Sequence, residues 1–349
     1  MQWVAILAAL VGTLGALTDL EAKFLKIPQA SMAREHLEHI TSFEHVAGTP
    51  GDLKSAQYVL DSFKKFGLSA EIQPYKALVS YPVSSSLRVY DSDRSKVFEA
   101  DLNEPALPVD ETSSYSILKN LSFHGYAPSG SVRGELVYVN YGRPEDFKFL
   151  TEQLGLDLRG KIALVRYGKV FRGLKVKNAQ EYGMIGCIVY SDPADDGFAF
   201  GNVYPSGPWR PEFSVQRGSV QFNSLCAGDP GLVERDPDIC GFRSDELIPR
   251  IPSIPLSYQN AQKLFELMGN NAQPPHDWIG SLSGYSVGPS SRQVELEVAN
   301  RFENATQWNV VAKITGILKP EQEVILGNHR DAWVFGAVDP NSGTCTSAS

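Results

Sequence analysis

The chain has 349 residues, of which 42% are hydrophobic and 21% are charged, and its formal net charge is −8. This length exceeds one ordinary domain and the composition is globular, so we expect about two domains. The acidic balance excludes general nucleic-acid binding, because phosphate binding requires a basic surface.

An apolar leader opens the chain, MQWVAILAALVGTLGALT over residues 1–18, with no charge before Asp19. Its length suits the core of a secretory signal peptide and lies near the lower limit for a membrane anchor. Because no Lys or Arg precedes it, a buried helix is a third alternative. The first two alternatives predict a secretory-pathway protein that is extracellular, vacuolar, lumenal or membrane-anchored. Two sequons, at Asn120 and Asn304, are typical of glycosylated chains in that pathway.

Two helices are predicted after the leader, over residues 31–43 and 49–66. In the second, apolar residues recur at helical spacing, Pro50 suits the first turn and Gly67 ends the helix. Extended chain follows over residues 70–91. A run of Ser beside a Pro within it predicts a change of domain near residue 80.

Five of the six histidines give little evidence of a metal site. His36 and His39 are spaced for one helix face, but Glu neighbours favour a solvated face over a metal pair. Three others have no partner at ligand spacing, and no function is assigned to them: His45, His124 and His276.

From residue 134 to 190 the pattern alternates between strands and helices of about ten residues, which predicts βαβ units with parallel strands. The expected strands are 135–140, 161–167 and 185–191, and the expected helices are 144–155 and 174–183. Residues 191–255 are rich in Pro, Gly and Asp and are predicted to form long loops, before a strand and a helix within 251–269.

Four cysteines exclude a disulfide-rich scaffold, and no Cys/His ligand spacing indicates a zinc finger. Cys187 lies in the apolar run GMIGCIVY and is predicted to be a small buried hydrophobe. Cys226 and Cys240 flank a loop rich in Gly, Asp and Pro. In an oxidising compartment they either pair or stay free, and the sequence leaves both alternatives open.

Two strands are expected near the C-terminus, over residues 308–318 and 323–329. The second contains the continuous apolar run EVILG and is therefore predicted to be central in a sheet. His329 ends this strand, and ligand groups gather at the carboxyl ends of strands in open α/β sheets.

Asp339 follows ten residues later, directly before Pro340, which restricts its backbone to extended geometry. His329 and Asp339 are candidate ligands of one metal ion if the loop between them folds back. The alternative is an ordinary salt-bridged turn followed by an ordinary helix start. Two ligands do not complete a catalytic zinc site, which needs three protein ligands.

The stretch GNHRDAWVFGAVDPNSG, residues 327–343, resembles the zinc signature of the glutamate carboxypeptidase II and N-acetylated-alpha-linked acidic dipeptidase family. Further segments resemble the same family in the same order: FEHVAGTPGDLKSAQYVLDSFKKFGL, FHGYAPSG, LVYVNYGRPEDF, GKIALVRYGKVFRGLKVKNAQ, YSDPAD, SVQRGSVQF and IPSIPLSYQNAQKL. The resemblance implies an α/β fold, with an incomplete zinc-peptidase mixed-sheet domain interrupted by a protease-associated (apical) domain. The implied parts are the leader, the first peptidase segment, the protease-associated domain and the resumed peptidase segment, at 1–18, 19–79, 80–303 and 304–349.

The resemblance also implies a zinc-dependent exopeptidase that hydrolyses short peptides with a water activated by two zinc ions. His329 matches a terminal zinc ligand, and Asp339 matches the carboxylate that bridges both ions. In the family, the general base and the other ligands follow the bridging Asp, whereas here no His, Asp or Glu follows Asp339. We therefore expect a truncated or differently spliced member that is inactive by itself.

Residues that match Phe171 and Arg172 line the family's pocket for the peptide's C-terminal residue, so a substrate with a C-terminal carboxylate is implied. By itself, the run of seven Lys and Arg over 159–177 would be a solvated basic face. Two differences weaken the match. Trp209 stands where the pocket has an Asn, and the residues after Gly228-Asp229-Pro230 lack the family's calcium ligands, so no calcium is predicted.

A second interpretation is a non-catalytic binding protein, because transferrin receptors resemble this family and lack its zinc ligands. Retention of His329 and Asp339 favours the peptidase for a longer parent, whereas the lack of further ligands favours binding for this chain. The family's homodimer implies a C-terminal helical region that this sequence does not contain. Apolar sheet edges left without the remaining strands would favour aggregation.

Overall fold

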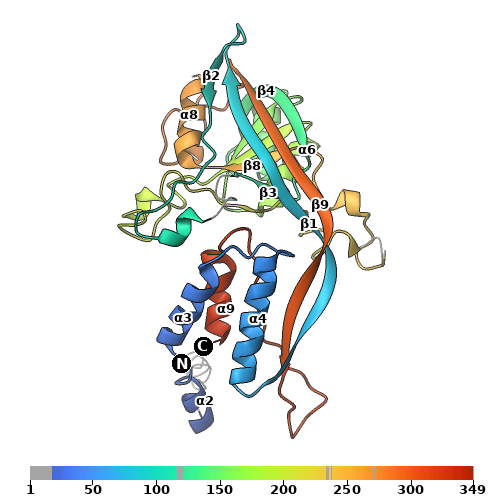
Figure 1. Ribbon diagram of the computed structural model, residues 1–349. Helices are drawn as coiled ribbons and strands as arrows, with labels where there is room; N and C mark the ends of the chain where they lie inside the picture. The colour runs from blue at the N-terminus through green and yellow to red at the C-terminus, as the bar shows by residue number, and fades with distance from the viewer. Residues whose placement is uncertain (1–17, 116–120, 233–235, 237, 270–271, 349) are drawn as a thin grey trace, which may run out of the picture. The chain divides into compact units, whose positions relative to one another are not determined.

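A mixed sheet of seven strands dominates the computed structural model, which describes residues 18–115, 121–232, 236, 238–269 and 272–348 (Figure 1). The strand order is β2-β1-β9-β4-β5-β6-β8. Its strands are β1 (Ser69–Tyr90), β2 (Lys96–Glu99), β4 (Gly130–Tyr138), β5 (Ile162–Arg166), β6 (Gly186–Tyr190), β8 (Ser253–Leu256) and β9 (Gln293–Lys313). A second, small sheet pairs β3 (His124–Gly125) with β7 (Gly218–Ser219) in parallel.

Strands β4, β5, β6 and β8 pair in parallel, as the alternating pattern predicted. Helix α5 (Pro144–Lys148), extended by a π-helical turn over Phe149–Gln153, connects β4 to β5, and α6 (Arg172–Glu181) connects β5 to β6. Both β5 and β6 are buried at every position, which explains why their sequences are apolar except for Arg166 at the end of β5. Because β9 pairs antiparallel with β4, the sheet is mixed, and the predicted α/β class is confirmed.

The chain divides into two compact units. We call Val46–Pro50 with Gln73–Asn309 the larger unit, and Met1–His45 with Gly51–Ile72 and Val310–Ser349 the smaller unit. Strand β1 runs through residue 80 without a break, and the change of domain that the sequence indicated near residue 80 stays a prediction. The core of the larger unit includes residues of its parallel strands and of helix α8 (Tyr258–Met268): Leu136, Tyr138, Ile162, Leu164, Ile188, Tyr190, Leu264 and Phe265.

In the described part of the smaller unit, the α-helices are α2 (Asp19–Phe24), α3 (Ala30–Thr41), α4 (Pro50–Lys65) and α9 (Ser342–Ala348). Helices α3 and α4 form where the sequence predicted them, and Figure 1 shows them beside α9. Their buried apolar residues include Ile40, Ala56 and Leu60. This small core positions the C-terminal segment described below.

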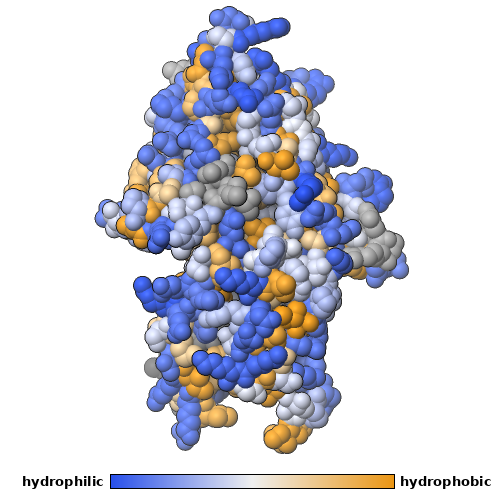
Figure 2. Space-filling model, in the orientation of Figure 1, coloured by the Kyte–Doolittle hydropathy of each residue, from blue (hydrophilic) through white to orange (hydrophobic). Residues whose placement is uncertain are grey.

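The predicted central strand over residues 323–329 is wrong. The segment is irregular, and Val324, Ile325 and Leu326 are 98%, 88% and 81% exposed. An apolar run forms a buried strand only where neighbouring strands pair with it and both of its faces are covered. None of the described strands pairs with these residues. The preceding strand, β9, ends at Lys313 instead of residue 318. Hydrophobic side chains gather at the lower end of Figure 2, near the loop that follows β9.

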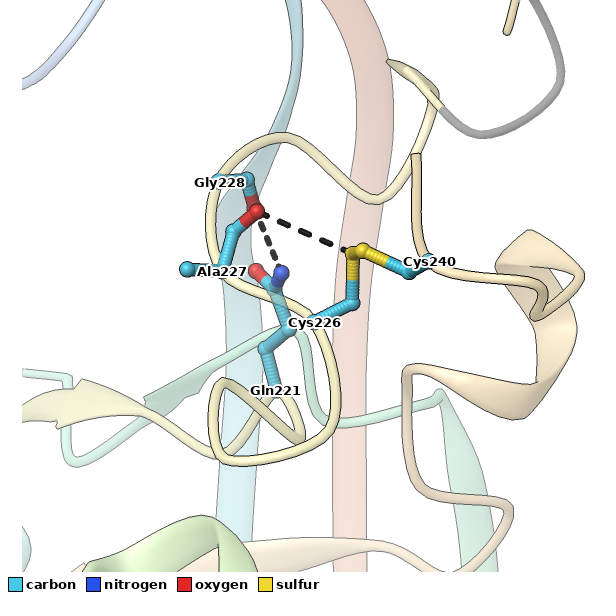
Figure 3. Close-up of a disulfide and its surroundings, with 5 residues drawn as sticks. All are labelled: Gln221, Cys226, Ala227, Gly228 and Cys240. Carbon is cyan, nitrogen blue, oxygen red and sulfur yellow. Dashed lines mark hydrogen bonds between the residues drawn. A yellow bond between two sulfur atoms is a disulfide. The ribbon is translucent and has the colours of Figure 1, made fainter. Parts of the chain in front are cut away.

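Cys226 and Cys240 form a disulfide in the larger unit, which resolves the alternative that the sequence left open (Figure 3). Gly228 lies inside the loop that they close, and its carbonyl accepts a hydrogen bond of 2.5 Å from the side chain of Gln221, which precedes the loop. Leu247 packs with the disulfide in a small hydrophobic cluster separate from the main core. Cys187 is fully buried, as predicted.

The two sequons and the leader are only partly covered by the structure. Asn304 is exposed on β9, whereas residues 1–17 of the leader and Asn120 lie outside the described residues. Of the helices that the structure does describe, none combines the length and apolar character needed to cross a membrane.

Candidate functional site

His329 and Asp339 are in direct contact in the smaller unit. Nε2 of His329 lies 2.6 Å from Oδ1 of Asp339, and the two side chains are 54% and 77% exposed. The loop between them folds back, with Gly336 at a φ of 62°, and Asp339 follows in extended backbone directly before Pro340. An imidazole nitrogen and a carboxylate oxygen, both donors that zinc accepts, therefore meet at one point.

Asp331 holds the other ring nitrogen of His329. Nδ1 lies 3.0 Å from the backbone oxygen of Asp331 and 3.3 Å from Oδ1 of the same residue. The hydrogen bond with Asp331 is the largest cause that raises the pKa of His329 to about 9, and Asp339 adds to it against the effect of burial. Histidines that bind metals typically have their second nitrogen held by a carboxylate or a carbonyl in this way.

Arg330 anchors the same segment on the first turn of α4. Its Nη1 donates to the backbone oxygen of Asp52 at 2.6 Å and to Oδ1 of Asp52 at 2.5 Å, and it also contacts the Ser55 hydroxyl. Asp52 is 1% exposed, and its place in the first turn of a helix favours a carboxylate. The His-Arg-Asp sequence is thus a salt-bridged turn, and that same turn presents His329 to Asp339.

Asn328 and Thr344 join the segment of His329 to the turn of Asp339. Nδ2 of Asn328 lies 3.1 Å from the oxygen of Pro340 and 2.8 Å from Oγ1 of Thr344. Oγ1 of Thr344 in turn donates to the backbone oxygen of His329 at 2.8 Å. Because Thr344 lies in α9, which begins just after Asp339, the expected helix start at this point is also present.

His45, to which the sequence assigned no function, packs against the turn of Asp339. It is completely buried, Nδ1 donates to the backbone oxygen of Phe43 at 2.9 Å, and Nε2 accepts from Nδ2 of Asn341 at 2.9 Å. Burial is the largest cause that lowers the pKa of His45, so the ring stays neutral. Sequence reasoning missed it because the contact joins residues 296 positions apart.

The described part of the chain contains no group of three or more His, Cys, Asp or Glu side chains placed to hold a metal ion. The prediction of a solvated face on the first helix is correct for His39, which is exposed, and wrong for His36. His36 is buried because Tyr58 covers it, with 2.8 Å between Nδ1 and the tyrosine hydroxyl.

Phe171 and Arg172 lie where α6 begins in the larger unit. Nη2 of Arg172 donates to Oε1 of Gln216 at 3.3 Å, and the guanidinium carbon lies 5.6 Å from the ring centre of Tyr167. Among the described residues, Nε of Arg172 is buried without a hydrogen-bond partner. The guanidinium therefore has donor capacity that these contacts do not use.

Comparison with known proteins identifies relatives along most of the chain. The PA domain family matches residues 132–221, within the larger unit. A probable glutamate carboxypeptidase of Arthroderma benhamiae is 42% identical over 314 residues, which cover 86% of this chain and 42% of that protein. Aminopeptidase NAALADL1 of Mus musculus is 37% identical over 339 residues, which cover 90% of this chain and 44% of that protein.

A solved structure of a peptidase M28 precursor from Shewanella amazonensis matches with a TM-score of 0.52 and 15% identity. The match covers 91% of this chain and 59% of that structure, and it shows a common fold. The chain thus spans less than half the length of the two curated relatives above. Together these findings confirm the resemblance that the ordered motifs indicated.

Proposed function

We propose that this chain, which is homologous to the glutamate carboxypeptidase family along about nine-tenths of its length, is part of a zinc-dependent exopeptidase. The contact between His329 and Asp339 carries the proposal, since both residues lie in the motif that matches the family's zinc signature. The relatives' names include a carboxypeptidase and an aminopeptidase, so peptide hydrolysis is their common activity. We propose the carboxypeptidase type for this chain because of Arg172.

His329 would bind zinc through Nε2, and Asp339 would bridge two ions through its carboxylate. The donor chemistry fits, because an imidazole and a carboxylate converge and Asp331 fixes the other nitrogen of the ring. When bound, zinc lowers the pKa of a coordinated water and polarises the scissile carbonyl. Two donors do not complete such a site, so the further ligands and the general base would come from the part of the relatives' length that this chain does not span.

Arg172 would hold the C-terminal carboxylate of a short peptide, with Phe171 beside it. A planar guanidinium pairs with both carboxylate oxygens at once, and Arg172 has an N–H group that no described residue uses. Each of the two sites is proposed from the geometry of its own unit.

By itself, this chain would bind peptides without cleaving them, because its described residues offer two zinc donors and no third. This observation also favours the second candidate function, a non-catalytic binding protein similar to transferrin receptors. The disulfide, the exposed sequon at Asn304 and the apolar leader support a location in the secretory pathway, because disulfides persist in oxidising compartments.

Zinc competition with a chromophoric chelator tests the proposed metal site. We expect the wild-type chain to bind zinc and the variants His329→Ala and Asp339→Asn to bind it at least tenfold more weakly. His276→Ala removes an exposed histidine of the larger unit and serves as the matched control. If the two site variants bind zinc as tightly as the control, the proposed ligand assignment is wrong.

A further inference from the structure

A buried chain of hydrogen bonds in the larger unit ends beside Arg172. Nε2 of His124 lies 2.9 Å from the hydroxyl of Tyr167, and this hydroxyl donates to the backbone oxygen of Gln216 at 2.6 Å. His124 is 0% exposed and Tyr167 is 8% exposed, so water does not compete for these bonds. His124 belongs to β3, which pairs in parallel with β7. Strand β7 begins at Gly218, two residues after Gln216.

The carbonyl at the end of the chain sets the direction of each bond. Because the backbone oxygen of Gln216 only accepts, the Tyr167 hydroxyl donates to it, and the phenol oxygen accepts from Nε2–H of His124. Nδ1 of His124 then carries no hydrogen, and it accepts from the hydroxyl of Ser253 at 3.0 Å. A neutral imidazole with its hydrogen on Nε2 therefore satisfies all three bonds.

Two effects keep His124 neutral. Burial and then the positive charge of Arg172 lower the pKa of His124 well below its ordinary value. The bonded arrangement agrees with this, because a second proton, on Nδ1, would force the Ser253 hydroxyl to reverse its bond. The bond directions therefore stay the same across the physiological pH range.

Tyr167 and Gln216 each contact the Arg172 side chain directly. The guanidinium carbon lies 5.6 Å from the ring centre of Tyr167, a distance at which a cation is attracted to the aromatic face. Both oxygens of Gln216 accept hydrogen bonds: the backbone oxygen accepts from the Tyr167 hydroxyl, and the side-chain oxygen accepts from Arg172 at 3.3 Å. Gly218, two residues after Gln216, leaves space for the Arg172 side chain, because a Cβ at this position would lie 2.3 Å from the guanidinium carbon.

We propose that His124, Tyr167 and Gln216 are positioning residues that fix the orientation in which Arg172 receives a peptide carboxylate. The proposal rests on the proposed function of Arg172 and adds the residues through which that function is controlled. A long, flexible side chain held in its binding orientation loses less rotamer freedom when the ligand arrives. A fixed planar fork also favours two carboxylate oxygens over the single oxygen of an amide.

Nitrogen-15 NMR of the imidazole side chains in the full chain tests the bond directions. We expect His124 to carry its hydrogen on Nε2, and its signals to stay constant from about pH 5.5 to about pH 8. Ordinary histidines titrate within that range. A hydrogen on Nδ1, or an ordinary titration, would overturn the proposal without any need for a variant.

Calorimetric binding of two peptides tests the effect on Arg172. The probes are an N-acetylated dipeptide with a free C-terminal carboxylate and the same dipeptide as its C-terminal amide. Removing one hydrogen bond of the network in Tyr167→Phe, which keeps the aromatic ring, should reduce the preference for the carboxylate about fivefold. His124→Phe should reduce it similarly, although Arg172 is unchanged in both variants.

Tyr138→Phe is the matched control, because Tyr138 is buried in the same unit and donates to the backbone oxygen of Trp278 at 2.8 Å. It should lower stability and leave the preference for the carboxylate unchanged. Arg172→Met tests carboxylate binding by Arg172 separately from the positioning of its side chain. If Arg172→Met abolishes the preference while Tyr167→Phe and His124→Phe keep it in full, the positioning inference is wrong and the function of Arg172 stands. If the wild-type chain shows no preference, both are wrong.

Discussion

Arg330 and Asp52 lie 278 positions apart in the sequence and form an ion pair with 2.5 Å between Nη1 and Oδ1. The pair joins the residue after His329 to the first turn of α4, and its side chains are 11% and 1% exposed. The orientation of the candidate metal ligand therefore depends on a helix near the beginning of the chain.

Replacing Arg330 with Met should strongly destabilise the smaller unit. The change removes the arginine that pairs with the buried carboxylate of Asp52, and the loss of one member of a buried pair costs about 3–5 kcal/mol. Denaturant unfolding measures the loss. The control is Arg159→Met, which removes a pair whose side chains are 81% and 60% exposed, and exposed pairs contribute about 0–1 kcal/mol. Equal effects of the two changes would contradict the anchoring role of Arg330.

Gly336→Ala should weaken zinc binding and lower stability. Gly336 has a φ of 62°, and a Cβ there would lie 2.6 Å from Cβ of Ala332 and 2.9 Å from Cδ of Pro340. The added methyl group is expected to cost about 1–3 kcal/mol and to displace the turn that carries Asp339. Gly316→Ala is the control in the same unit, because a Cβ there meets no atom within 4 Å. Unchanged zinc affinity in Gly336→Ala would show that the turn does not determine the site.

The stability of the larger unit should rise between about pH 7 and about pH 8.5 because of Lys175. Burial lowers the pKa of Lys175 to about 7, and its Nζ donates to the backbone oxygens of Tyr141 and Gly168 at 2.5 and 2.7 Å. The lysine of the unfolded chain titrates at about pH 10.4. Between these two pKa values the unfolded chain binds more protons than the folded chain, so stability increases with pH. The slope is at most about 1.4 kcal/mol per pH unit.

Lys175→Met should flatten this pH dependence, and chemical unfolding at several pH values measures it. Lys263→Met, which changes an exposed lysine of α8, should leave the slope unchanged. The window ends at about pH 8.5, the ordinary pKa of a thiol. Burial raises the pKa of the Cys187 thiol to about 12, so above pH ~8.5 this thiol makes stability fall as the pH rises. A slope that persists in Lys175→Met would assign the effect to another group.

The exposed apolar segment after β9 should promote self-association. Val324, Ile325 and Leu326 form an exposed apolar run with unpaired backbone, which is a known template for strand pairing between chains. Changing all three to Thr should lower the sedimentation-derived association constant and leave the unfolding midpoint within about 0.5 kcal/mol of that of the wild-type chain. Unchanged association would show that other surfaces are responsible.

Sequence patterns predicted the elements whose structure depends on local spacing. The strands β5 and β6 are apolar except for Arg166, and the helices α3 and α4 have helical periodicity, so each could be located from its own residues. The segment EVILG carries the same apolar signal, but a strand also needs neighbours to pair with, and the signal does not reveal whether they are present.

The candidate site was only partly predictable for a similar reason. His329 and Asp339 are ten residues apart and belong to one recognisable motif. His45 contacts Asn341 across 296 positions of the sequence, and Arg330 contacts Asp52 across 278. No local sequence pattern marks contacts over such separations. His124 gave no sequence signal, because its partners come from β8 and from the segments that follow β5 and precede β7.

Nitrogen-15 NMR of His329 during a zinc titration tests the central claim most directly. We predict that Nε2 loses its contact with Asp339 and shifts to the position of a metal-bound nitrogen, while Nδ1–H stays bonded to Asp331. In the same titration His276 should not change. If zinc binds and the signals of His329 do not move, or if zinc does not bind at all, then His329 and Asp339 are not the metal ligands of this chain.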